Sequence, residues 1–254
     1  MNPILMLCRN SLALTKRAVV SVLTQDIPNT LYIINNDSTD GTTEWLAEEM
    51  LSWQPEQNYG PIRNWRFTPA KGVSASWNFG LDYLFGTAMC DKVLVVNNDV
   101  ELHKSNYRWL DLDGGPFVTG VSTDDAMAIH DGWARVKRPN PDFSNFLIRR
   151  DVWEKVGKFD ESMILYCSDG DYHLRMHQAG IEAYTIGIPF YHYASGTLKS
   201  AEPNEKATIL RQADLDRDTF ERKWGCKMGS PEYYALFDIA ARQSGAAPGA
   251  TAGF

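Results

Sequence analysis

Acidic and amide side chains follow an apolar run near the middle of the chain, and their chemistry suits a divalent cation. Asn97, Asn98 and Asp99 come directly after the run Val93–Val96, which is typical of a buried strand. Carboxylate and amide oxygens at a strand end are hard ligands, suited to Mg²⁺ or Mn²⁺ that bridges to phosphates. The alternative is an ordinary turn rich in Asn and Asp, which holds no metal.

A second acidic cluster offers a candidate general base. Asp169 and Asp171 open a predicted helix, in which Asp171 and Arg175 are four residues apart and can pair on one face. Asp169 then points to a different side of the helix. We therefore expect Asp169 to be free to face a cleft as a base.

The histidines have weaker signals. His173 and His177 have a spacing that can bind zinc, but the glutamate of His-Glu-x-x-His is missing, so we expect surface or packing histidines. His192 follows the apolar run Ile188–Tyr191, and a lone histidine near a strand end is more often structural. The sequence has no GxGxxG, Walker A or GxSxG motif, so dehydrogenases, P-loop NTPases and α/β-hydrolases lose their usual support.

The elements that must position these residues alternate between strand and helix over the first hundred residues. Apolar runs predict strands at residues 4–8, 31–34, 62–67 and 92–97, and helical spacing predicts helices at 11–25, 40–51 and 73–84. This alternation predicts a parallel sheet with helices on both faces, where ligands bind beyond the carboxyl ends of the strands. Three polar clusters should therefore meet at one rim: residues 8–10, 35–38 and 97–99.

The remainder of the chain is less regular before it becomes helical. Residues 103–144 are rich in Asp, Gly and Pro and predict short strands and loops. Further patterns predict strands at 146–148 and 182–186 and helices at 151–156, 169–178, 204–224 and 231–243. We expect one domain over residues 1–200, a C-terminal helical extension over 201–244 and a disordered tail over 245–254.

Composition sets the broad class. The chain has 254 residues, with Lys+Arg 25 and Asp+Glu 32, which gives a net charge of −7 and argues against a generic nucleic-acid coat. No apolar run approaches the ~20 residues of a transmembrane helix, and the first residues lack the basic region of a signal peptide. Four scattered cysteines fit a reducing compartment, so we expect a cytoplasmic protein.

In their order and spacing, these clusters resemble the family 2 glycosyltransferases of the GT-A fold, and most closely the rhamnosyltransferase-like branch. The matching segments are residues 3–25, 33–42, 72–80, 95–100, 157–161, 169–180, 192 and 223–225. The resemblance implies an α/β fold with a Rossmann-like, mostly parallel sheet flanked by helices. It also implies transfer of a hexosyl or deoxyhexosyl group, with inversion, from a nucleotide-sugar donor to an acceptor hydroxyl.

The resemblance also implies a role for each matching residue. Asp99 and His192 would hold Mn²⁺ or Mg²⁺, and Asp169 would be the general base. Contacts to the nucleotide-sugar would come from Arg9, Asn35, Asp37, Lys71, Gly72, Asn97 and Asn98. Trp133, Asp160 and Glu161 would lie on the acceptor side. Asn35 stands where the family usually has an Asp that accepts from uracil or thymine, so UDP-, dTDP- and GDP-sugars all stay open as donors.

Two other functions fit part of the pattern. A nucleotidyltransferase shares metal–phosphate chemistry, but it ordinarily has a glycine-rich phosphate loop, whereas residues 7–11 contain no glycine. A catalytically idle GT-A module could bind a glycan or act as a scaffold. The acceptor stays open among saccharide, protein, lipid-linked and modified-nucleobase molecules, and the sequence leaves the oligomeric state open. We expect residues 103–144, with Trp109, His130 and Trp133, and the C-terminal helices to form the acceptor site.

Overall fold

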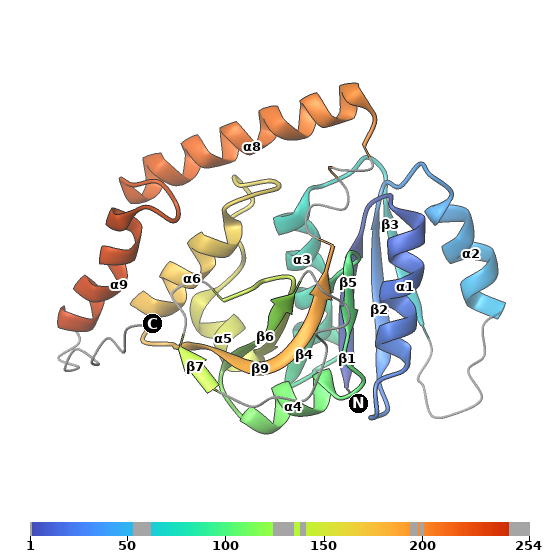
Figure 1. Ribbon diagram of the computed structural model, residues 1–254, viewed down its shortest axis with the longest axis horizontal. Coiled ribbons are helices and arrows are strands. Elements are labelled where there is room, and N and C mark those ends of the chain that lie inside the picture. Colours follow the sequence, from blue (N-terminus) through green and yellow to red (C-terminus); the bar gives the residue numbers. More distant parts are fainter. Residues whose placement is uncertain are drawn as a thin grey trace.

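A curled, mixed β-sheet runs through the computed structural model, which describes residues 2–52, 62–123, 135–137, 141–193, 198 and 201–243 (Figure 1). The strands are β1 (Pro3–Cys8), β2 (Thr30–Asn36), β3 (Arg63–Phe67), β4 (Lys92–Asn97), β5 (Val100–Leu102), β6 (Phe117–Thr123), β7 (Arg135–Lys137), β8 (Asn145–Arg149) and β9 (Ala183–His192). Their order in the sheet is β3-β2-β1-β4-β8-β6-β9-β5, and β7 pairs with β9.

Helices cover both faces of this sheet. They are α1 (Leu12–Leu23), α2 (Thr42–Ser52), α3 (Val73–Asp82), which continues into a π-helical turn η1 (Tyr83–Thr87), α4 (Asn106–Asp113), α5 (Arg150–Val156), α6 (Ser168–Gln178), α8 (Pro203–Trp224) and α9 (Pro231–Gln243). Strands β3, β2, β1 and β4 are parallel to one another, as predicted. The second half is mixed, because β8 runs antiparallel to both β4 and β6.

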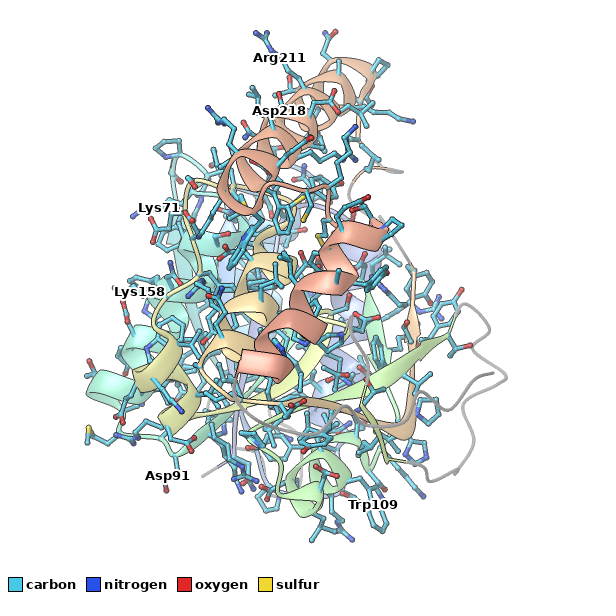
Figure 2. The ribbon with its side chains drawn as sticks, turned by 90° about the vertical axis from the view of Figure 1, so that its left-hand side faces the viewer. Lys71, Asp91, Trp109, Lys158, Arg211 and Asp218 are labelled. Atoms are coloured by element: carbon cyan, nitrogen blue, oxygen red, sulfur yellow. The ribbon has the colours of Figure 1, made fainter. Side chains whose placement is uncertain are left out.

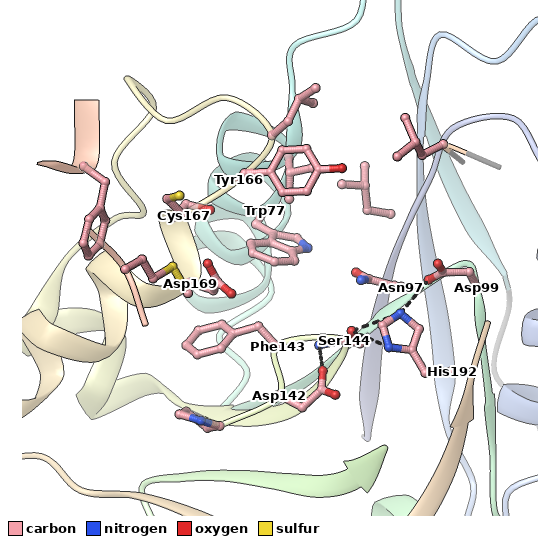
Figure 3. A pocket seen from close by; sticks show the side chains of 18 of the residues that line it. Trp77, Asn97, Asp99, Asp142, Phe143, Ser144, Tyr166, Cys167, Asp169 and His192 are labelled. Atoms are coloured by element: carbon pink, nitrogen blue, oxygen red, sulfur yellow. Dashed lines mark hydrogen bonds and ion pairs between the residues drawn. The ribbon is translucent and has the colours of Figure 1, made fainter. Parts of the chain in front are cut away.

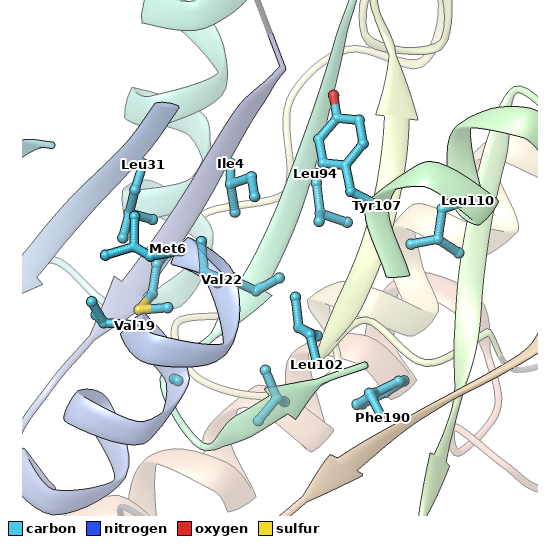
Figure 4. Packing of buried hydrophobic residues seen from close by; sticks show 14 of the residues in the cluster. Ile4, Met6, Val19, Val22, Leu31, Leu94, Leu102, Tyr107, Leu110 and Phe190 are labelled. Carbon is cyan, nitrogen blue, oxygen red and sulfur yellow. The ribbon is translucent and has the colours of Figure 1, made fainter. Parts of the chain in front are cut away.

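Strand β1 lies at the centre of two hydrophobic cores. Every residue of β1 is buried, and its side chains alternate between the two faces of the sheet. Ile4 and Met6 pack into the core beneath α1 (Figure 4), whereas Leu5 and Leu7 pack into the core beneath α3. This double burial explains why the strand reads as a continuous apolar run in the sequence.

The prediction of short strands and loops over residues 103–144 was wrong at residues 106–113, which form helix α4. Its buried Tyr107 and Leu110 are three residues apart and pack into the core that contains Ile4. An eight-residue helix has too few turns for a periodic pattern to stand out in the sequence. The expected tail over residues 245–254 lies outside the described residues, and the boundary after residue 200 stays a prediction.

A buried carboxylate ties α8 to the segment that precedes α6. Asp216 is fully buried and accepts hydrogen bonds from the backbone amides of Ile164 (3.0 Å), Leu165 (2.7 Å) and Tyr166 (2.9 Å). The side-chain amide of Gln212 donates a fourth, at 2.8 Å. Hydrogen bonds to an ionised acceptor are roughly twice as strong as those between neutral groups. Asp216 therefore fixes residues 164–166 against α8.

Over the described part of the chain, no helix is both long enough and apolar enough to cross a membrane. Helix α8 has 22 residues, but charged side chains are spread along it. All four cysteines are free thiols, and Cys8, Cys167 and Cys226 are buried.

We predict that Asp216→Asn lowers the free energy of unfolding by about 3 kcal/mol, because an amide removes the charge from a carboxylate that serves several buried donors. Asp218→Asn is the matched control, since Asp218 lies on the same helix but is exposed, and it should change stability by less than about 0.5 kcal/mol. Urea denaturation of both variants measures the difference. Equal stabilities would contradict the role given to Asp216.

Candidate active site

Asn10, directly beyond the end of β1, joins the three polar clusters at one rim of the sheet. Its backbone amide donates to Ser38 Oγ (2.8 Å), and its side-chain oxygen accepts from the amide of Thr39 (2.8 Å). Its backbone carbonyl accepts from Asn98 Nδ2 (3.1 Å). The predicted meeting of residues 8–10, 35–38 and 97–99 is therefore confirmed.

A cleft of about 1160 Å³ opens beside this rim (Figure 3). Its lining from the rim includes Arg9, Asn36, Asn97, Asn98, Asp99 and His192. Residues 141–144 continue the lining beside the rim, where Ser144 lies next to His192, and residues 165–169 and the cleft-facing side of α8 line the rest. Typical small-molecule sites measure about 300–1,000 Å³, so this cleft lies just above the upper end of that range.

Asp99 and His192 come together because β5 and β9 pair next to them. Val100 pairs with His192 in the sheet, and the amide of Tyr193 donates to the Asp99 carbonyl at 2.9 Å. His192 Nε2 then lies 3.5 Å from Asp99 Oδ1, and both ring nitrogens lie 3.4 Å from Ser144 Oγ. A single ion about 2.1 Å from each ligand can span that separation.

This donor set fits a divalent cation such as Mn²⁺. One carboxylate and one imidazole occupy two coordination positions, and Mg²⁺ usually takes its other ligands from water and substrate phosphates. Within the described ranges, no group of three His, Cys, Asp or Glu residues could hold a metal ion. The residues present therefore match a metal that is shared with a phosphate-bearing substrate better than a closed structural site.

Asp169 faces the same cleft from the first turn of α6 (Figure 3). Burial raises the pKa of its carboxyl and the negative charge of Asp142 raises it further, against the opposing effect of backbone hydrogen bonds at Gly170 and at Asp169 itself. A raised pKa brings a carboxylate closer to the range in which it accepts a proton efficiently at neutral pH. Asp171 lies on the other side, where it pairs with Arg175 at 2.8 Å as predicted.

Asn35 is engaged within its own loop. It is 3% exposed, its Nδ2 donates to Thr43 Oγ1 (2.9 Å), and its Oδ1 accepts from the amide of Ser38 (3.0 Å). The next residue, Asn36, lines the cleft, and its Oδ1 accepts from the amide of Lys71 (2.8 Å). Of the two adjacent amides, the structure thus brings Asn36 and not Asn35 to the cleft.

Lys71, Gly72 and Asp37 also lie outside the cleft lining. Lys71 Nζ sits 4.6 Å from the ring centroid of Phe67, at the outer edge of the molecule in Figure 2. Gly72 has φ +83°, and a Cβ there would lie 2.8 Å from the carbonyl oxygen of Ile164. That carbonyl accepts from the amide of Val73, the first of α3, at 2.8 Å, so this amide is already satisfied by residue 164.

Two of the predicted acceptor-side residues, Asp160 and Glu161, do not line the cleft. Asp160 pairs with Lys223 at 2.6 Å, and Glu161 accepts from Asn78 Nδ2 at 2.8 Å. Trp133 lies outside the described residues. Their contacts with an acceptor stay predictions.

His173 and His177 pack against Phe237 of α9, which confirms the packing interpretation. The ring centroids lie 4.5 Å and 5.1 Å from that of Phe237, and His177 Nε2 lies 2.6 Å from its backbone oxygen.

Asp142, Ser144 and Tyr166 line the cleft although their sequence context did not mark them. Asp142 accepts from the amide of Ser144 at 2.8 Å, and the carbonyl of Ser144 accepts from the amide of Asn97 at 3.0 Å. This pairing, at the entrance of β8, brings Asp142 beside the rim. Only the antiparallel pairing of β8 with β4 creates the contact, and the sequence pattern contains no signal for it.

No protein-family model and no curated protein matches the sequence. Among solved structures, GalNAc-T7 with UDP, GalNAc and Mn²⁺ aligns with a TM-score of 0.61 and 11% identity over 96% of this chain. The Pyrobaculum calidifontis mannosyltransferase PcManGT with GDP-Man and Mn²⁺ aligns with a TM-score of 0.58 and 14% identity, over 97% of this chain and 75% of that protein. Residues 1–349 of S. aureus TarS align with a TM-score of 0.57 and 14% identity, over 94% of this chain and 79% of that fragment. This chain spans 55% of GalNAc-T7. The fold is the GT-A fold of these glycosyltransferases, as expected.

We predict that Asp142→Asn lowers the pKa of Asp169, because the substitution removes a nearby negative charge that favours the protonated form. A carboxyl-detected NMR titration of the protein alone measures this pKa. Asp218→Asn, another substitution in the cleft lining, should leave it unchanged. An Asp169 pKa that is the same in Asp142→Asn and wild type would contradict the electrostatic coupling.

Proposed function

We propose that the protein is a metal-dependent glycosyltransferase, which moves a hexosyl or deoxyhexosyl group with inversion from a nucleotide-sugar to an acceptor hydroxyl. One observation carries the proposal: the Asp99–His192 pair and the carboxylate of Asp169 line different parts of a single cleft (Figure 3). A cation site for a diphosphate and a base for a hydroxyl are the two groups that such a transfer needs. The fold, shared with glycosyltransferases, supports this assignment.

In the proposed reaction, Asp169 accepts the proton of the acceptor hydroxyl. The hydroxyl oxygen forms a bond to the anomeric carbon while the bond from that carbon to the diphosphate oxygen breaks, so a nucleoside diphosphate leaves. Attack from the side opposite the leaving group inverts the anomeric centre. The raised pKa of Asp169 suits this role, because the base must hold the proton it receives.

Asp99 and His192 would hold the metal ion, with Asn97 and Asn98 beside them at the end of β4. When bound, the ion supplies positive charge to the departing diphosphate. Arg9, which lines the same part of the cleft, is placed to contact the donor phosphates once its ion pair with Glu205 (3.3 Å) opens. Arginine matches phosphate geometry with several parallel donors.

The donor base stays open among UDP-, dTDP- and GDP-sugars. The solved relatives hold UDP or GDP-Man, so both classes belong in a first screen with Mn²⁺. Asn36 is the amide best placed to contact the donor from the cleft wall, because both ends of the Asn35 amide are used in its loop. The acceptor stays open among saccharide, protein, lipid-linked and modified-nucleobase molecules.

We predict that Asp169→Asn lowers transfer, or donor hydrolysis in the absence of acceptor, by about 10²–10⁴-fold, because an amide cannot accept the proton. Binding of the nucleotide-sugar should be retained, since Asp169 lies away from the rim. Turnover and calorimetric titration with UDP- and GDP-sugars in Mn²⁺ measure the two effects. Turnover by Asp169→Asn at the wild-type rate would remove it as the base. Donor binding without turnover in wild type would favour the idle module.

We predict that Asp99→Asn weakens Mn²⁺ binding at least about tenfold, because the variant loses the only carboxylate of the pair. Mn²⁺ titration followed by electron paramagnetic resonance, with a nucleoside diphosphate present, reports the affinity directly. Asp113→Asn, outside the cleft lining, serves as the control and should bind Mn²⁺ like wild type. Unchanged affinity in Asp99→Asn would locate the metal elsewhere.

A further inference from the structure

We infer that Lys223 is a positioning residue for the proposed reaction: from the end of α8 it holds the first turn of α6, and with it Asp169, in place. The inference rests on the proposed role of Asp169 as the base. Lys223 does not line the cleft, so it acts through the residues that it contacts.

The central contact is to Asp171, two residues after the proposed base. The Asp171 side chain is 0% exposed. Its Oδ2 accepts from Arg175 Nε (2.8 Å), and its Oδ1 accepts from Trp224 Nε1 (3.0 Å) and lies 2.7 Å from Lys223 Nζ. A buried carboxylate is tolerated only while such donors surround it, so the end of α8 and the start of α6 must keep this arrangement.

Lys223 has a second carboxylate partner, Asp160, at 2.6 Å. Although partial burial acts to raise the pKa of Asp160, hydrogen bonds from Lys223 and Ser162 lower it to about 2. Asp160 begins the segment that leads into α6. One ammonium group therefore joins the beginning of this segment to the first turn of the helix that follows it.

Close packing restricts the same turn. Gly170, between Asp169 and Asp171, lies against Met228, and a Cβ at this position would lie 2.7 Å from the sulfur of Met228. Met228 belongs to the turn that connects α8 to α9. The end of α8 contacts Asp171 by an ion pair, and the turn after α8 contacts Gly170 by packing, so both residues that follow the base are held.

Removal of the Lys223 charge leaves Asp160 and Asp171 without the cation between them. Breaking a buried ion pair by removal of one partner is strongly destabilising for the charge that remains. Arg175 still faces Asp171 from one side, so the turn would shift toward Arg175 and water would enter. Misplacement of a reacting group by 1 Å can cost about 10²-fold in rate.

Lys223→Met tests this inference, and Lys223→Arg is its conservative partner. We expect the kcat of Lys223→Met to fall about 100-fold, while the Kd for the nucleotide-sugar in Mn²⁺ stays within about twofold of wild type, because the rim is untouched. Lys223→Arg should restore most of the rate, since it keeps the positive charge and hydrogen-bond donors. A wild-type kcat in folded Lys223→Met would overturn the inference.

Ala213→Gly separates positioning from stability. Ala213 is buried on the same helix and does not line the cleft, and glycine costs about 1 kcal/mol in a helix interior. We expect this variant to lose stability and keep its kcat below its melting temperature. An equal loss of kcat in Ala213→Gly and Lys223→Met would assign the effect to stability alone.

The double variant Asp160→Asn/Lys223→Met tests whether the loss of kcat arises from the carboxylates that lose the Lys223 charge. It removes one of the two carboxylates and leaves Asp171 paired with Arg175, so its kcat should exceed that of Lys223→Met alone. A kcat no higher than that of the single variant would contradict the charge argument.

Hydrogen exchange provides a measurement that needs no activity. The backbone amides of residues 170–172 should exchange faster in Lys223→Met than in wild type or Lys223→Arg. If wild type binds no nucleotide-sugar, the proposed function fails. Hydrogen exchange still tests whether Lys223 holds the first turn of α6 through Asp160 and Asp171. Unchanged protection in Lys223→Met would overturn this inference.

Discussion

The site depends on one constraint: the loop that leaves the fully buried strand β1 must also hold the loops after β2 and β4 together. Asn10 meets this constraint with its backbone amide, its backbone carbonyl and its side-chain oxygen, which bond the loops after β2 and β4. Its φ of +56° lies in the left-handed region, which Asn tolerates better than most residues. Because β1 cannot move within its two cores, these bonds fix the rim from which Arg9 and Asp99 face the cleft.

Helix α8 connects this rim to the other wall of the cleft. At its first turn Glu205 pairs with Arg9, in its middle Asp216 holds the amides of residues 164–166, and at its end Lys223 reaches Asp171. It crosses the top of the molecule above the strand ends in Figure 1. The helix is mostly polar, so these specific contacts, together with the buried Ala213 and Phe220, determine its place.

The sequence predicted the parts of the fold that local patterns encode. Buried strands such as Val93–Val96 appear as apolar runs, and their polar ends meet because parallel strands share an edge. The sequence could not show which of Asn35 and Asn36 faces the cleft. Asn35 is held inside its loop because Thr43 accepts from its amide nitrogen and Ser38 donates to its amide oxygen. The sequence also missed Asp142, since the antiparallel β8 is what brings that residue to the rim. Tertiary contacts, which sequence periodicity does not encode, therefore decide which of two adjacent side chains faces the cleft.

The described lining of the cleft has an excess of acidic side chains, which favours a cation beside the phosphates of the proposed donor. The lining contains the carboxylates Asp99, Asp142, Asp169, Asp214, Asp218 and Glu221, against the cations Arg9, Arg217 and Lys227. Arg9 already faces Glu205 at 3.3 Å and Arg217 faces Asp214 at 2.7 Å. A diphosphate that entered this cleft alone would meet net negative charge. A divalent ion held by Asp99 and His192, as proposed, would reverse that sign locally and so favour a phosphate-bearing substrate within the acidic lining.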